Sequence, residues 1–190
     1  MNMISVKIMD ECNRKFYIKS SWLVVILFII RCLITIPILL YDYISFIGEA
    51  ISVALILMGL YEKWLWQYNP LEKIPKINGK YSGYIEYSYN GNFDKKKANI
   101  SIVQSLLSVK IKIYTNEISS SSITSNFIYE NGEHVLYYTY ITNPMSKYSK
   151  DNPIQHGTCR LQIKSKTELQ GIYWTTRQTI GDIHLHRKLM

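Results

Sequence analysis

Two long apolar runs occupy the first third of the chain. Residues 22–40 carry one charged side chain, Arg31, and residues 44–61 carry one, Glu49. Runs of about 18–19 residues rise about 27–28 Å as α-helices, just enough to cross the hydrocarbon core of a bilayer. The intervening residues 41–43 are too few to form a domain. This pattern predicts two transmembrane helices that form a hairpin with its turn at residues 41–43.

Basic residues before an apolar run are also typical of a secretory signal peptide. No small-residue cleavage site follows the first run, however, and the second run begins at once. The predicted turn carries only Asp42, whereas basic side chains flank the opposite ends of both helices: Lys7, Arg14, Lys15, Lys19, Lys63, Lys73, Lys76 and Lys80. The positive-inside rule therefore predicts a multi-pass protein with both termini in the cytoplasm.

Arg31 and Glu49 would lie inside the bilayer, where a charge costs at least about 2.5 kcal/mol on insertion scales. Such residues usually face a partner. With the turn at Asp42, Glu49 lies about one helical turn from the level of Arg31, an offset that a long arginine can bridge. We expect a membrane charge pair that either fixes the register of one hairpin or joins neighbouring hairpins, with a slight preference for the second.

From residue 77 onward the apolar runs give way to short segments rich in Val, Ile, Thr and Tyr. Turn-forming pairs such as Asn131-Gly132 and Asn143-Pro144 separate them. Eight such strands with hairpin-length links predict an up-and-down barrel or a compact sandwich, and an eight-stranded barrel has room for one small ligand. The predicted strands are 80–89, 97–104, 106–115, 119–129, 134–142, 157–165, 168–177 and 182–188.

The predicted organisation has four parts. A cytoplasmic N-terminus (1–21) precedes the transmembrane hairpin (22–66), a linker (67–76) and a cytoplasmic β-domain (77–190). The chain has a net charge of +8, and the β-domain carries six of these surplus positive charges. This charge favours a nucleotide, a nucleic acid or an anionic lipid as partner, or serves solubility alone. The three cysteines show no paired spacing, which favours a reducing compartment over a disulfide framework.

The β-domain lacks a recognisable catalytic motif. It has no GxSxG, no HExxH and no Walker-type loop, so we expect no enzyme. His184 and His186 share a strand face without an evident third ligand, so we expect no metal site. A ligand that combines phosphates with bases needs guanidinium groups and aromatic faces. The domain offers Arg160, Arg177, Arg187 and eleven of the sixteen tyrosines, which favours a ligand receptor.

Several short motifs follow one another along the β-domain. They are GKYSG at 79–83, ISIVQS at 100–105, Ser-x-Ser at 120–122, LYYTY at 136–140 leading to Asn143-Pro144, HGT at 156–158, LQGIYWTTR at 169–177 and GDIHLHR at 181–187. Behind two membrane helices, this order resembles the two-transmembrane β-barrel membrane effectors of bacterial cyclic-oligonucleotide-based antiphage signalling systems, in the CD-NTase-associated protein family. The resemblance covers the whole chain.

The resemblance implies a mainly β fold, in which the two-helix transmembrane hairpin is followed by a compact eight-stranded up-and-down β-barrel. It implies that the barrel binds a cyclic dinucleotide made by a cGAS/DncV-like nucleotidyltransferase. Binding would drive self-association of the helices, disrupt the cell inner membrane and kill the infected cell, which is abortive infection. No catalysis, no cofactor beyond the activating ligand and no nucleic-acid polymer are implied. Matched by motif position, the ligand-binding residues are Tyr81, Gln104, Ser120, Ser122, Tyr138, Tyr140, His156, Thr175, Arg177 and Arg187.

Two other classes remain open on the residues alone. A membrane-anchored, lipocalin-like barrel that binds a lipid or another small ligand would have an apolar interior. A membrane-tethered adaptor for a protein partner would have a barrel packed solid with side chains. The interior of the barrel therefore distinguishes the three hypotheses.

Overall fold

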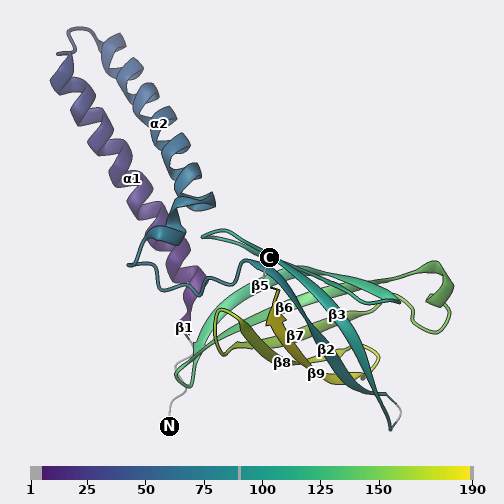
Figure 1. The fold of residues 1–190 in the computed structure, drawn as a ribbon. Helices are drawn as coiled ribbons and strands as arrows, with labels where there is room; N and C mark the ends of the chain where they lie inside the picture. Colours follow the sequence, from purple (N-terminus) through teal and green to yellow (C-terminus); the bar gives the residue numbers. More distant parts are fainter. Residues whose placement is uncertain (1–5, 90, 189–190) are drawn as a thin grey trace. The chain divides into compact units, whose positions relative to one another are not determined.

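The computed structural model of the chain describes residues 6–89 and 91–188 (Figure 1). It divides into two compact units. The helical unit comprises residues 10–72 together with residues 105–107. The β unit comprises residues 73–104, the chain from residue 108 onward and the stretch before residue 10.

Two long helices, α1 (Ile8–Ile34) and α2 (Leu40–Lys63), make up most of the helical unit. With 27 and 24 residues they are about 40 Å and 36 Å long. Both are long and apolar enough to cross a membrane, which is compatible with the predicted hairpin. The buried residues of α2 are Phe46, Ala50 and Ala54, spaced one turn apart. Small side chains at this spacing let two helix backbones approach closely.

The turn between the helices differs from the sequence prediction. It lies at residues 35–39, and residues 41–43 belong to the first turn of α2. Pro37 explains the earlier end of α1, because proline disfavours helix in the residue before it and offers no N–H. Asp42 explains the start of α2: its carboxylate accepts hydrogen bonds from the N–H groups of Ile38 (3.0 Å) and Leu39 (2.9 Å).

Arg31 and Glu49 pair with each other within one hairpin. The Nε of Arg31 donates to Oε2 of Glu49 at 2.7 Å. Its Nη1 donates to Oγ1 of Thr35 at 2.8 Å, and the guanidinium lies 4.2 Å from the centre of the Phe46 ring. This contact within one hairpin is the geometry that the register-fixing role requires.

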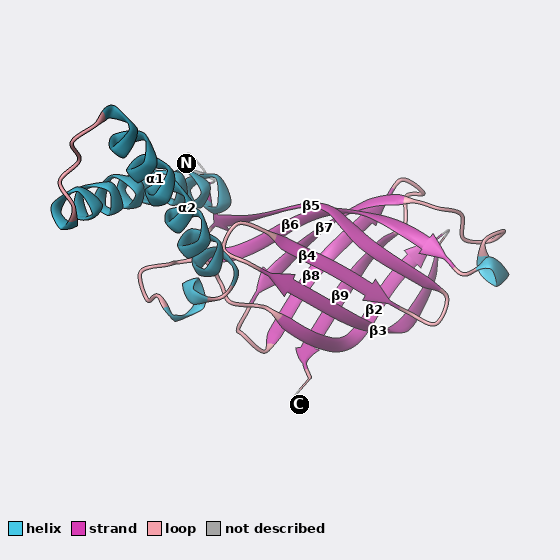
Figure 2. Ribbon diagram, turned by 90° about the horizontal axis from the view of Figure 1, so that it is seen from above, coloured by secondary structure: helices cyan, strands magenta, loops and turns pink. Residues whose placement is uncertain are grey.

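The β unit is a closed antiparallel barrel of eight strands (Figure 2). Each strand pairs with the next along the chain, and the last pairs with the first, so the predicted up-and-down barrel is confirmed and the sandwich is not formed. A short strand β1 (Val6–Lys7) adds to β5. The barrel strands are β2 (Gly79–Tyr89), β3 (Asn92–Gln104), β4 (Val109–Tyr114), β5 (Ile118–Glu130), β6 (Glu133–Pro144), β7 (His156–Ile163), β8 (Glu168–Thr175) and β9 (Ile180–Arg187).

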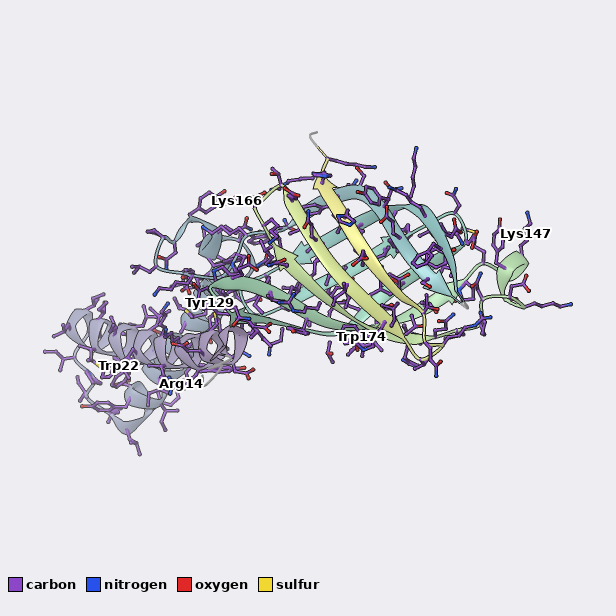
Figure 3. All side chains as sticks on the ribbon, turned by 90° about the horizontal axis from the view of Figure 1, so that it is seen from below. Arg14, Trp22, Tyr129, Lys147, Lys166 and Trp174 are labelled. Carbon is purple, nitrogen blue, oxygen red and sulfur yellow. The ribbon has the colours of Figure 1, made fainter. Side chains whose placement is uncertain are left out.

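One half of the barrel interior is filled. Its fully buried side chains include Phe127, Leu136, Leu161, Leu169 and Leu185. Tyr81 closes this end, because its buried hydroxyl lies within hydrogen-bonding distance of the carbonyl oxygens of Ile77 (3.1 Å) and Lys166 (3.2 Å). Figure 3 shows Lys166 and Lys147 at opposite ends of the barrel, so we call the Lys166 end the closed end and the Lys147 end the mouth.

Gln104 fixes the segment that leads into β2. Its side chain is buried, its Oε1 accepts the N–H of Ile77 at 2.9 Å, and its Nε2 donates to the carbonyl of Pro75 at 2.7 Å. The backbone N–H of Gln104 reaches Oδ1 of Asn78 at 3.3 Å. The amide therefore satisfies backbone groups that have no strand partner at this point.

Replacing Gln104 by leucine should destabilise the barrel. Gln104→Leu leaves the Ile77 N–H and the Pro75 carbonyl without a partner, which should lower the free energy of unfolding by about 2–4 kcal/mol. The measurement is chemical denaturation of the full chain in detergent. Gln170→Leu is the control, because that amide donates to Glu168 on the outer face of β8. Equal losses in the two variants would contradict the structural role of Gln104.

Candidate ligand-binding site

The mouth half of the barrel is hollow. It encloses a cavity of about 400 Å³, within the range of roughly 300–1,000 Å³ that is typical of small-molecule sites. All the barrel strands except β7 contribute to its lining. The apolar part of the lining is formed by Ile85, Ile113, Ile118 and Ile183.

Four tyrosines, Tyr87, Tyr138, Tyr140 and Tyr173, form the aromatic part of the lining. The ring centres of Tyr138 and Tyr140 are 5.9 Å apart, with the rings tilted by 48°. Burial raises the pKa of Tyr138, Tyr140 and Tyr173 above the usual tyrosine value. Their hydroxyls therefore stay protonated at neutral pH, so they can donate as well as accept hydrogen bonds.

Two glycines leave room for these rings. A β-carbon at Gly157 would overlap the ring of Tyr140, and one at Gly181 would overlap the ring of Tyr173. The neighbouring strands thus carry no side chain where the rings lie. Cys159 lies buried beside Tyr138, and burial raises its thiol pKa to about 12. A protonated, buried thiol is a packing group rather than a nucleophile.

Lys96 and Glu117 form an ion pair in the lining. Nζ of Lys96 donates to Oε2 of Glu117 at 2.7 Å and lies 5.2 Å from the centre of the Tyr87 ring. Burial alone would lower the pKa of Lys96, but its hydrogen bonds to Glu117 and Tyr87 raise it above the usual lysine value. Lys96 is therefore cationic at neutral pH.

Arg177 is the second cation of the lining. Its Nη1 donates to the backbone carbonyl of Asp151, in the loop between β6 and β7. The charged side chains of the lining are thus two cations, Lys96 and Arg177, and two acids, Glu117 and Asp151. The cavity contains groups that recognise phosphate, but its formal charge is balanced.

Five of the ten predicted ligand-binding residues lie together in this lining. They are Ser120, Tyr138, Tyr140, Thr175 and Arg177. They come from β5, β6, β8 and the turn after β8, and the closed barrel arranges them around one cavity.

The other five lie outside the cavity. Tyr81 and Gln104 form hydrogen bonds with residues 75–78, the segment that leads into β2. Arg187 donates through Nη2 to the carbonyl of Asn78 in the same segment at 2.9 Å. Ser122 accepts the N–H of Ile111 at 2.9 Å, beside a β-bulge in β5, and His156 is exposed. Alternation identifies inward positions along a whole strand, whereas the cavity occupies only half of the barrel's length.

Sequence reasoning missed several lining residues. Tyr173 carried a usable signal, because it shares a strand face with Thr175 and Arg177. Lys96 lies in a run of three lysines, and nothing in the run indicates which of them points inward. Glu117 and Asp151 lie in turns, where alternation makes no prediction. Within residues 6–89 and 91–188, no group of three or more His, Cys, Asp and Glu side chains could hold a metal ion.

The fold and the cavity together define a small-ligand receptor: a closed barrel with an aromatic, charged pocket, in a chain that also has two apolar helices. Residues 72–187 match the family model described as "Cap15, cyclic dinucleotide receptor domain". The chain is also 35% identical over 181 residues to CD-NTase-associated protein 15 of Staphylococcus schleiferi, covering 94% of this chain and 98% of that protein. The chain belongs to the Cap15 family of CD-NTase-associated proteins, which confirms the resemblance noted in the sequence.

The buried tyrosines predict a loss of stability in alkali. A raised pKa in the folded state means that the unfolded chain loses the phenol proton first, at about pH 10. The stabilisation is present below that pH and decreases as the pH rises above it. Tyr138→Phe should reduce the slope of unfolding free energy against pH by about 1 kcal/mol per pH unit between pH 10 and 11.

The measurement is chemical denaturation of the full chain in detergent at several pH values from 8 to 11. Tyr129→Phe, which removes an exposed hydroxyl, serves as the control and should retain the wild-type slope. If Tyr138→Phe also retained that slope, the phenol of Tyr138 would not be held in its neutral form by the barrel.

Proposed function

We propose that the chain is a membrane effector of antiphage defence whose barrel cavity binds a cyclic dinucleotide. The observation that carries this proposal is the composition of the lining: four tyrosines with two cations, Lys96 and Arg177. Aromatic faces stack on bases, and ammonium and guanidinium groups bind phosphates. The family model that matches residues 72–187 is described as a cyclic dinucleotide receptor domain, which supports the same ligand.

Each part of such a ligand has a counterpart in the cavity. The two bases stack against rings among Tyr87, Tyr138, Tyr140 and Tyr173, while the two phosphates approach Lys96 and Arg177. Thr175 and Ser120 supply hydroxyls for the remaining polar atoms. When a phosphate reaches Lys96, it replaces the carboxylate of Glu117. Lys96 thereby exchanges one anionic partner for another and stays paired in the bound state.

The output is produced in the membrane. Ligand binding promotes self-association of the helical hairpins in the cell inner membrane, with both termini in the cytoplasm, and the resulting assembly disrupts the bilayer and kills the infected cell. The ligand comes from a partner nucleotidyltransferase, an association that the name of the Staphylococcus schleiferi relative supports. The chain acts by binding, without catalysis. Two apolar helices long enough to cross a bilayer support this output.

The two alternative classes fit the interior less well. A lipid chain would leave Lys96, Glu117 and Arg177 desolvated without new partners, which is unfavourable for buried charges. A protein adaptor requires no interior space, whereas this barrel encloses about 400 Å³.

Arg177→Ala should weaken cyclic dinucleotide binding. It removes a charge-assisted contact worth about 1.5–3 kcal/mol, so the dissociation constant should rise about 10- to 150-fold. The matched control is Arg187→Ala, which removes an arginine from the closed end. Calorimetric titration of the full chain in detergent with a panel of cyclic dinucleotides measures both.

The same proteins in dye-loaded liposomes test the output. Wild type and Arg187→Ala should release dye when ligand is added, and Arg177→Ala should require more ligand. If no member of the panel bound the folded wild-type protein, the receptor assignment would be wrong. Binding without dye release would contradict the proposed membrane output and retain the receptor.

Glu117→Gln should strengthen binding of the same ligand. The substitution removes the acid that competes with phosphate for Lys96, and the half-buried pair contributes about 1 kcal/mol, so affinity should rise about three- to tenfold. Glu133→Gln, which removes the acid of the exposed Lys164 pair, should leave the affinity unchanged. Weaker binding by Glu117→Gln would show instead that the carboxylate accepts a hydrogen bond from the ligand.

A further inference from the structure

The outer surface of the barrel is strongly basic over three adjacent strands. Strand β4 reads Val-Lys-Ile-Lys-Ile-Tyr, and its buried and exposed positions alternate, so both lysines point outward. Exposed lysines also occur on the outer face of β2 and β3 and just after β9. We call the set the basic face; it consists of Lys80, Lys97, Lys110, Lys112 and Lys188.

The strand register makes the basic face continuous. Ser101 of β3 lies directly opposite Lys80 of β2 on one side and Lys112 of β4 on the other. Lys110 lies opposite Val103, one position further along the same face. Directly opposite side chains are about 5 Å apart at Cβ, so these residues form one surface rather than scattered charges.

Positive charge on this surface is uncompensated. No ion pair involves Lys80, Lys97, Lys110 or Lys112 in the described part of the chain, and Nζ of Lys188 donates to the neutral side chain of Asn99 at 2.8 Å. Glu86 is an acid at an outward position of β2, but it pairs with Lys95 and not with a lysine of the basic face. The interior of the barrel balances its charges, whereas this face does not.

We propose that the basic face docks the barrel on anionic phospholipid headgroups. The proposal rests on the part of the proposed function that inserts the hairpin in a membrane, and it is independent of the cavity's ligand. Only residues 64–78 separate α2 from β2, so a hairpin in the bilayer keeps the barrel close to the surface at high effective concentration. Juxtamembrane lysines are attracted to an anionic leaflet within about a Debye length.

The side chains suit a lipid surface better than a specific phosphate site. All five charges are lysines, which act as flexible point charges, and no arginine offers the planar fork that binds one phosphate in a fixed geometry. Val103 is exposed among them, as expected where a surface meets the headgroup layer. Tyr84, the aromatic ring opposite Lys97, is already stacked on His184 at 5.0 Å, so it does not offer a free face to a nucleic-acid base.

Amine footprinting tests this proposal on the full chain. The protein is reconstituted in nanodiscs that contain phosphatidylcholine alone or with about one-third phosphatidylglycerol, labelled briefly with an amine-reactive reagent and mapped by mass spectrometry. Labelling of Lys97, Lys110 and Lys112 should fall about fivefold or more in anionic nanodiscs, and 1 M salt should restore it. Lys147, at the mouth, should label equally in both (Figure 3).

A variant with Lys97→Glu, Lys110→Glu and Lys112→Glu provides the second arm. The two remaining basic-face residues, Lys80 and Lys188, should label equally in both lipids, because the attraction has been reversed. Equal labelling of the wild-type face in both lipids would overturn the proposal. Protection that depends on protein concentration rather than lipid charge would also overturn it, and would assign the face to a protein partner. Alkaline carbonate extraction reports membrane insertion separately, so failure of the hairpin and failure of docking are distinguishable.

Discussion

Closure of the barrel by the pairing of β9 with β2 is the constraint on which the receptor depends. Once the sheet has no edges, every second residue of each strand is committed to the interior. Eight strands leave an interior that side chains can just fill, so a cavity arises only where side chains are missing or turned aside. Gly157 and Gly181 have no side chain, which leaves room for the rings of Tyr140 and Tyr173 that line the cavity. The side chains packed in the filled half stabilise the barrel, so the mouth half can keep a cavity.

The charged side chains inside the barrel are arranged differently from those on its outer surface. Inside, Lys96 is neutralised by Glu117, so the proposed ligand would have to compete with this carboxylate for Lys96. Outside, the lysines of the basic face form no ion pair with any acid among residues 6–89 and 91–188. In the helical unit, Arg31 and Glu49 neutralise each other within one hairpin. These two charges therefore have each other as partners without a neighbouring hairpin.

Periodicity in the sequence predicted most of the architecture. Both apolar helices and all eight barrel strands follow from run length and alternation, because these report directly on burial. Pro37 moved the helical turn, an effect that hydrophobicity alone does not reveal. The site was only half predictable: Ser120, Tyr138, Tyr140, Thr175 and Arg177 lie in the cavity, whereas inward residues such as Tyr81 lie at the filled end. Which end of a barrel is hollow depends on contacts between distant strands.

The most direct test of the receptor model is a structure of the full chain, in a membrane mimetic, bound to the cyclic dinucleotide that titrates most tightly. The model predicts ligand density in the mouth half of the barrel, with bases against the tyrosine rings. It also predicts a phosphate at Arg177 and another at Lys96, with Glu117 released from its ion pair. Ligand bound at the closed end beside Tyr81 and Arg187, or on the outside of the barrel, would contradict it.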